Sequence, residues 1–235
     1  MAGSSHVGHV RRRNEDALYI GRSLFAVADG LGGHPAGDVA SATVIETLRS
    51  HDRTLAPDGL PAALGQAVNA ANEAVGQRIA AEPQLAGMGS TLVALMWSET
   101  VAVLGYVGDS RAYLLRRDGT GAEGMRQITE DHTYEHLVAD ATDVPNLPER
   151  LSRWLDGRAD GRSPDITRWN LLLGDRFMLC SDGLSSYVPH DLIDATLSAS
   201  ENPQVVADRL VSLALDHGGP DNVTVIVADV SKRSR

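Results

Sequence analysis

The chain has 235 residues, 43% of them hydrophobic, and a formal net charge of −10 at pH 7. This length and apolar content suffice for a substantial core, and because the composition does not shift along the chain we expect a single domain over residues 1–235. The acidic balance, without a basic run interleaved with aromatic residues, argues against nucleic-acid binding. The single cysteine, Cys180, gives no basis for a disulfide framework or a thiolate metal cluster.

The N-terminal segment has no apolar core of the signal-peptide type, and no later segment approaches the length needed to cross a bilayer. We therefore expect a cytoplasmic protein with no membrane segment. The sequence also shows no repeats or low-complexity stretches, and we expect a monomer.

The first third of the chain contains two short apolar runs followed by two amphipathic helices. Residues 17–20 and 24–28 are bounded by turn residues and are expected to form two strands that pair antiparallel. The first helix is expected to begin with Asp38 as its N-cap. The second has apolar residues at three- and four-residue spacings from Leu60 and is expected to stop at Pro83. Together the helices are expected to cover one face of a sheet.

Four apolar or alternating segments follow, joined by short links. They are residues 91–97, 101–107, 111–116 and 125–128. Because a parallel crossover needs a dozen or more residues, these segments are expected to form an antiparallel meander.

The stretch from Thr129 to Pro164 loses this regularity. Asp, Pro, Gly and Arg are frequent there, apolar residues are sparse, and only residues 134–139 and 149–155 look briefly helical. Long irregular segments of this kind are usually functional or mobile. We expect a mobile surface insertion, or lid.

Regular patterns return after the insertion. Strands are expected at 166–173, 176–180 and 223–230, a helical pair at 191–197 and 204–215, and a polar tail at 231–235. Antiparallel strands interrupted by two helical pairs indicate an α+β domain built in layers.

Aspartates occupy the ends of several of these strands. Asp29, Asp109 and Asp182 each follow an apolar run, and Asp221 comes just before the last one. In the first three cases the next residue is Gly or Ser, which leaves room for an ion or ligand to approach the backbone. A single Asp-Gly pair is a common solvated turn, but four such sites beside buried strands favour a shared metal site.

The ligand type selects the metal and the chemistry. Carboxylates and backbone carbonyls, without clustered Cys or His, favour Mg²⁺ or Mn²⁺ over Zn²⁺. Two such ions about 4 Å apart could share one carboxylate and activate a bridging water for attack on a phosphoester. Arg11 could bind the phosphate through its guanidinium fork, although a solvated basic trio of Arg11, Arg12 and Arg13 is the simpler alternative.

Other phosphate chemistries fit the sequence less well. A dinucleotide-binding loop after residue 28 would need its third glycine at Pro35, and Asp29 would face the pyrophosphate. A Cys-x5-Arg nucleophile loop would need Arg at the position of Ser186, and the segment Asp29-Gly30-Leu31 lacks the second Asp of an aspartyl-phosphate enzyme. No covalent nucleophile is therefore evident.

Six short motifs occur in order over nearly the whole chain. They are Arg11-x-x-Asn14-Glu15-Asp16, Asp29-Gly30-x-Gly32-Gly33-His34, Gly87-Met88-Gly89-Ser90-Thr91, Gly108-Asp109-Ser110-Arg111, Ser181-Asp182-Gly183-Leu184 and Gly219-Pro220-Asp221-Asn222. Together they resemble the motifs of the metal-dependent type 2C (PPM) serine/threonine protein phosphatases in their bacterial form. The resemblance implies a four-layer α/β/β/α sandwich of two antiparallel sheets flanked by helical pairs, with metals at one end between the sheets. It also implies phosphorylated protein substrates, targets of a eukaryotic-like Ser/Thr kinase.

The resemblance further implies a role for each site residue. Asp29 would bridge two Mn²⁺ or Mg²⁺ ions, Asp182 and Asp221 would complete the first site, and the Gly30 carbonyl would serve the second. Asp109 with Asp182 would hold a weaker third ion. Arg11 would bind the substrate phosphate. Glu15 and Asp16 match acidic positions that hold metal-bound waters, or else they anchor the N-terminal turn.

The chain departs from the family at two places. Eukaryotic members carry a His directly after the Asp-Gly pair, where this chain has Leu31, so the proton donor to the leaving group is unassigned. Residues 129–164 fall where family members have a flap, but their second half does not match. Two other functions stay open, a metal-dependent hydrolase of small phosphoesters and an inactive phosphoprotein-binding module.

Overall fold

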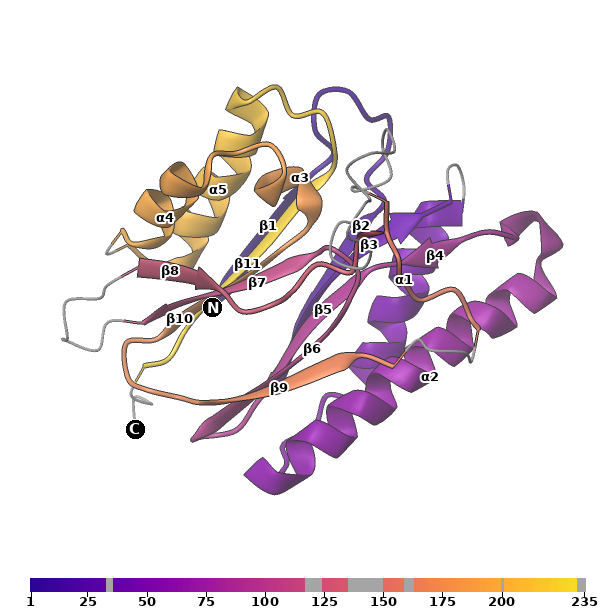
Figure 1. Ribbon diagram of the computed structural model, residues 1–235, viewed down its shortest axis with the longest axis horizontal. Helices are drawn as coiled ribbons and strands as arrows, with labels where there is room; N and C mark the ends of the chain where they lie inside the picture. The colour runs from indigo at the N-terminus through magenta and orange to yellow at the C-terminus, as the bar shows by residue number, and fades with distance from the viewer. Residues whose placement is uncertain (33–35, 117–123, 135–149, 159–162, 200, 232–235) are drawn as a thin grey trace.

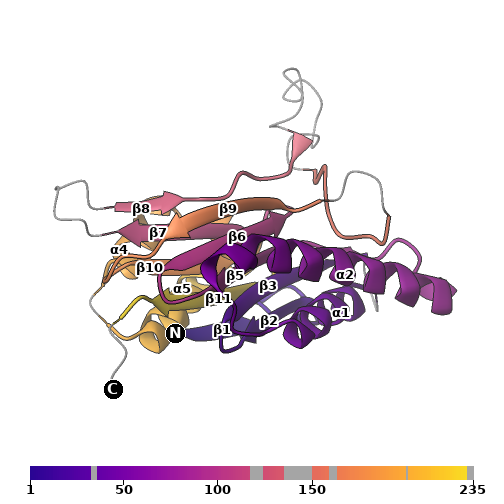
Figure 2. The same ribbon diagram turned by 90° about the horizontal axis from the view of Figure 1, so that it is seen from below.

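The protein is described here as a computed structural model that covers residues 1–32, 36–116, 124–134, 150–158, 163–199 and 201–231. Two antiparallel sheets face each other, and helices cover the outer face of each (Figures 1 and 2). This is the four-layer α/β/β/α arrangement of an α+β sandwich. No helix in the described ranges is long and apolar enough to cross a membrane.

One sheet contains the first and the last strand of the described residues. Its order is β1 (Ala2–His6), β11 (Val223–Asp229), β10 (Arg176–Cys180), β7 (Arg111–Arg116) and β8 (Gly124–Gln127). Its outer face is covered by α4 (His190–Leu197) and α5 (Pro203–Asp216), preceded by the single-turn α3 (Asp182–Ser185) (Figure 1).

The other sheet is built mainly from the first half of the chain. Its order is β2 (Asp16–Ile20), β3 (Leu24–Leu31), β5 (Leu92–Trp97), β6 (Val101–Val107) and β9 (Asp165–Asn170), with the short β4 (Gly89–Ser90) paired to β3. Its outer face is covered by α1 (Ala36–Ser50) and α2 (Leu60–Ala81), which are linked by the 3₁₀ turn η1 (Pro57–Gly59). A second 3₁₀ turn, η2 (Pro83–Leu85), follows α2.

Three apolar layers hold the four structural layers together. Phe25 and Val27 of β3 point into the layer between the sheets, while Leu24 and Ala26 point into the layer beneath α1 and α2. A third layer packs β10 and β11 against α5 and includes the fully buried Leu210. Because β3 is buried on both faces, it reads as a continuous apolar run, which is why its sequence is recognisable as a strand.

The predicted meander is wrong at its centre. β5 pairs with β6, and β7 pairs with β8, but β6 and β7 belong to different sheets. The chain crosses between them at Gly108, whose φ of 108° lies in the left-handed region that favours glycine. A three-residue link fits a sheet change as well as a hairpin, so its length alone could not separate the two.

Other local features also differ from the prediction. β3 continues through Asp29 to Leu31, so Asp29 lies within the strand rather than after it. Helix α1 begins at Ala36, and Asp38 sits in its first turn, where its carboxylate accepts a hydrogen bond from the Val39 amide at 2.9 Å. Asp38 is therefore not the N-cap. The sequence also gave no sign of β1, an edge strand of small and polar residues.

The insertion is anchored at the two ends that the structure describes. Thr133 and Leu151 form an antiparallel bridge, so the helix predicted over 149–155 is wrong for its described residues. Leu155 is fully buried and pairs with Ser90 beside β3. Residues 135–149 and 159–162, most of the predicted helix at 134–139, and the tail after Ser231 lie outside the described residues. The mobility of the insertion therefore stays a prediction.

Candidate metal centre

The strand-end aspartates meet at one end of the sandwich. Cys180 at the end of β10 lies opposite Arg111 at the start of β7 and opposite Val225 near the start of β11. Asp109, Asp182 and Asp221 therefore lie at the same end of the strands of this sheet. The other sheet contributes Asp29 of β3 and Asp16 of β2, which are direct partners in the register.

The pKa values of Asp29 and Asp16 are both raised. Burial raises the pKa of Asp29 well above its usual range, and Asp16, Asp182, Asp109 and Asp221 raise it further. Burial and neighbouring aspartates also raise the pKa of Asp16 to about 7. Asp16 and Asp29 are each partly exposed as whole residues, but their carboxyl groups lie among protein atoms. Without a cation, several of these groups favour the protonated form near neutral pH.

The same effects extend to the other sheet. Burial raises the pKa of Asp109 to about 7, and Asp182 adds to the shift. Burial also raises the pKa of Asp182, and repulsion from Asp221 adds to it, while a hydrogen bond with Asp29 offsets part of the increase. Repelling carboxylates from both sheets form a site that a divalent cation would stabilise.

The donor set fits a hard cation. The Oδ1 atom of Asp16 is buried without a hydrogen-bond partner, and such an atom normally has one. Among the residues that the structure describes, no three Asp, Glu, His or Cys side chains are arranged to hold an ion by themselves. Mg²⁺ commonly binds through one or two carboxylates and keeps several of its waters. Carboxylates that do not form a closed cage therefore suit this ion.

Uncharged side chains fix the carboxylates in place. Ser181 donates from its hydroxyl to Asp16 at 2.8 Å and accepts from the Thr224 amide at 3.0 Å, which joins the two sheets. The Thr91 hydroxyl accepts a hydrogen bond from the Asp29 amide at 3.1 Å. Sequence reasoning found Ser181 and Thr91 only as members of motifs. The place of Ser181 directly before Asp182 was the available signal, but the partners of both residues are distant in sequence.

Asn222 ties the N-terminal segment to the site. Its side-chain amide donates to the carbonyls of Val7 at 2.9 Å and Arg13 at 2.8 Å, and its Oδ1 accepts from the Glu15 amide at 2.7 Å. Asn222 directly follows Asp221. One buried side chain therefore positions the segment that carries Arg11 beside the last strand.

The glycines next to the aspartates serve backbone packing. A Cβ atom on Gly30 would lie 1.9 Å from the Gly37 carbonyl oxygen, and one on Gly183 would lie 1.8 Å from the Asn222 carbonyl oxygen. These contacts give both glycines a packing role, and the sequence interpretation that small residues here leave room for an ion stays a prediction. Chain segments already fill the space that a side chain would take.

Arg11 and Glu15 lie at the rim. Arg11 donates from Nη2 to Asp221 Oδ2 at 2.7 Å, and its side chain is 54% exposed. A Cβ on Gly37 would come within 2.4 Å of Glu15 Oε2, so the Glu15 carboxylate lies against the first turn of α1, whose partial positive charge favours it. His34 lies outside the described residues.

Comparisons with known proteins agree with this arrangement. The protein phosphatase 2C model matches residues 2–213. The serine/threonine protein phosphatase PstP of Mycobacterium tuberculosis is 43% identical over 97% of this chain, which spans 44% of that protein's length. The serine/threonine phosphatase stp of Listeria innocua is 32% identical over 94% of this chain and 92% of its own length.

A solved structure shares the fold. The catalytic domain of PstP in complex with two manganese ions superposes with a TM-score of 0.84 and 43% identity, over 98% of this chain and 97% of that one. The six motifs, the two-sheet sandwich and the family match over most of the chain agree with one another. The chain belongs to the protein phosphatase 2C family.

Proposed function

We propose that this chain is the catalytic domain of a metal-dependent serine/threonine protein phosphatase, which hydrolyses phosphoserine and phosphothreonine in proteins. The observation that carries the proposal is the convergence of aspartates from both sheets, with the pKa values of Asp16 and Asp109 raised to about 7. Family membership and the manganese in a neighbouring structure support it.

We propose the metal ligands that the resemblance to the family implies. Asp29 lies between the two sheets and is proposed to bridge two Mn²⁺ or Mg²⁺ ions, with Asp182 and Asp221 on the first ion and the Gly30 carbonyl on the second. Asp109, with Asp182, is proposed to hold a weaker third ion. Glu15 and Asp16 are proposed to orient waters bound to the ions. When bound, such ions supply a water acidic enough to attack a phosphoester at neutral pH.

Arg11 is proposed to orient the substrate phosphate. Its hydrogen bond to Asp221 uses one of the five N–H groups of the guanidinium, and the pair is open to solvent. Exposed ion pairs contribute little to stability, so exchange of this partner for a phosphate costs little. Leu31 carries no proton to donate, and we propose that the leaving group takes its proton from water.

The partners and setting are proposed with the activity. We infer that the substrates are phosphoproteins made by a eukaryotic-like Ser/Thr kinase, and that the chain acts as a cytoplasmic monomer. Residues 1–235 are proposed to form one catalytic domain in which residues 129–164 form the flap insertion and influence substrate choice.

The test compares two substrates in the presence and absence of metal. Hydrolysis of both p-nitrophenyl phosphate and a phosphothreonine peptide with Mn²⁺, and of neither with chelator, is expected. Hydrolysis of small phosphoesters alone would favour a small-molecule hydrolase. Metal-dependent binding of the peptide without turnover would favour an inactive binding module.

A further inference from the structure

The turn that carries Asp109 is held on both flanks by two consecutive residues of the insertion. Asp131 accepts three hydrogen bonds from Arg111, at 3.0, 3.0 and 2.7 Å. The next residue, His132, contacts Gly108 twice. Its amide donates to the Gly108 carbonyl at 3.0 Å, and its Nδ1 accepts from the Gly108 amide at 3.0 Å. Asp109 lies between these two attachments.

The His132 ring is itself held by strands β6 and β9. It is buried and stacks on Tyr106 at 5.1 Å between ring centroids, with 19° between the planes. Its Nε2 lies 3.1 Å from Asp165 Oδ2. Tyr106 and Asp165 are direct partners in the register, so one strand pair supplies both supports.

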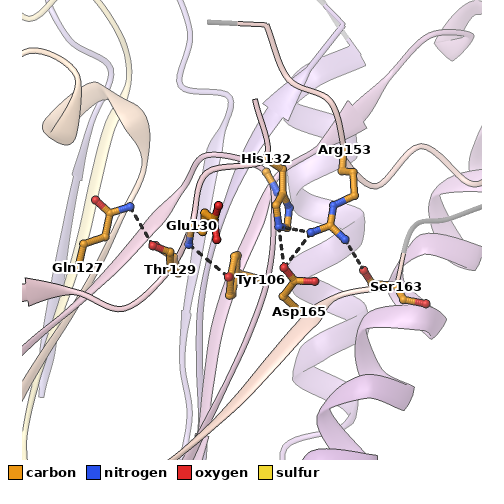
Figure 3. Close-up of polar contacts among 9 residues, drawn as sticks. Tyr106, Gln127, Thr129, Glu130, His132, Arg153, Ser163 and Asp165 are labelled. Carbon is orange, nitrogen blue, oxygen red and sulfur yellow. Dashed lines mark hydrogen bonds and ion pairs between the residues drawn. The ribbon is translucent and has the colours of Figure 1, made fainter. Parts of the chain in front are cut away.

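Arg153 completes this cluster from the far end of the insertion. It donates from Nη2 to Asp165 Oδ2 at 2.9 Å and also contacts His132 Nε2. Figure 3 shows the His132, Asp165 and Arg153 side chains pointing toward one another. The two described ends of the insertion are therefore joined to each other beside Gly108.

These contacts define the protonation state of His132. Because Nδ1 accepts from a backbone amide, the ring proton sits on Nε2 and points to Asp165. Burial lowers the pKa of His132, with Arg153 adding to the effect, and the hydrogen bond to Asp165 only partly offsets it. A second ring proton would face the Gly108 N–H, where it could not bond.

We propose that His132 is a positioning residue for Asp109. It acts through the main chain of Gly108 at the point where the chain crosses between the sheets. The inference rests on the proposed metal site. A carboxylate in a turn outside both strands lacks the support of a sheet ladder, so its orientation depends on what holds its neighbours. Partners of this kind typically change metal affinity by about 10- to 100-fold.

Two substitutions of His132 separate hydrogen bonding from packing. His132→Phe keeps a ring to stack on Tyr106 but loses the acceptor for Gly108. His132→Asn places an amide oxygen close to the position of Nδ1 but loses the ring. Asp109→Asn is expected to abolish one Mn²⁺-binding step. We expect His132→Phe to weaken this step by about tenfold. In His132→Asn the affinity of the same step is expected to stay within about twofold of the wild type. Isothermal titration calorimetry with Mn²⁺ measures this step.

A second variant and a second measurement cover the case in which His132→Phe fails to fold. Asp165 is 45% exposed, so Asp165→Ala should fold, and it is expected to weaken the same step several-fold. Hydrogen exchange of the Gly108 amide, followed by NMR, should accelerate in His132→Phe and stay slow in His132→Asn. In the Asp109→Asn background, none of these variants should change Mn²⁺ binding further.

The outcomes distinguish this inference from the proposed function. Equal binding by the wild type, His132→Phe and Asp165→Ala would overturn the positioning role. Equal weakening in His132→Phe and His132→Asn would overturn it too, because ring packing would then be the cause. If the wild type bound no Mn²⁺ at all, the proposed metal site would be wrong. The role of His132 in positioning Asp109 for a metal would then be wrong too, whatever the hydrogen-exchange rate of the Gly108 amide.

Discussion

Asp16 of β2 and Asp29 of β3 are direct partners across two antiparallel strands, so their carboxylates lie on the same face of the sheet, at the end of the sandwich that holds the candidate metal centre. Like charges directly opposite one another destabilise a strand pair. The repulsion adds to the raised pKa of Asp29. Burial, with Asp182 and Asp221, raises the pKa of Asp16, so the folded state is sensitive to pH when no cation is bound.

The first prediction concerns this pH dependence. The pKa of Asp16 is about 7 in the folded protein against a usual 3.8, so between these values the folded state binds more protons than the unfolded state. Its contribution to the free energy of unfolding therefore falls as pH rises through this window. In chelator, Asp16→Asn is expected to gain thermal stability relative to the wild type from pH 4.5 to 7.5. Differential scanning fluorimetry measures the difference in Tm, and a difference that shrank with pH would contradict the prediction.

The second prediction concerns metal binding by Asp29. Because Asp29 is proposed to bridge two ions, Asp29→Asn is expected to lower turnover by more than about 100-fold, beyond the usual effect of outer-shell partners. Mn²⁺ at a hundred times its Kd is expected to stabilise the wild type by about 2.7 kcal/mol and the variant by much less. Thermal melts with and without Mn²⁺ measure this. Equal stabilisation of both proteins would place the ions elsewhere.

The third prediction separates phosphate binding from metal binding. Arg11→Ala is expected to reduce kcat/KM by about 10- to 100-fold, the equivalent of one or two hydrogen bonds to a charged group. Its Mn²⁺ affinity should change less than its kcat/KM, because a guanidinium cannot ligate a cation. Arg12→Ala is the matched control, since Arg12 is an exposed neighbour that is given no role. Unchanged kinetics in Arg11→Ala would leave Arg11 as an ordinary surface residue.

The fourth prediction tests why Gly30 is a glycine. Its missing side chain makes room for the Gly37 carbonyl, so Gly30→Ala is expected to destabilise the metal-free protein by about 1–3 kcal/mol or more. Gly65→Ala in α2 is the control, because a Cβ there meets nothing within 4 Å and helix propensity favours alanine by up to about 1 kcal/mol. Urea denaturation measures both. Similar stability in the two variants would show that the contact at Gly30 relaxes easily.

The sequence by itself determined the order of most helices and strands. Runs such as 24–28 and 223–228 are buried on both sides, and α2 repeats its apolar residues with the helical period, so local patterns carry the information. The aspartates beside these strands, and the motifs that contain them, also indicated the family. Each of these features can be read within a window of a few residues.

The tertiary structure alone decided how the strands divide between two sheets and what supports the site. β1 has no apolar pattern and exists because β11, more than 200 residues away, offers it an edge. The hydrogen bonds of Asn222 to Val7 and of His132 to Gly108 join segments that no local pattern relates. A polar side chain has many possible hydrogen-bond partners along the sequence. The path of the whole chain decides which of them comes within reach, so a contact between distant segments cannot be read from either segment alone.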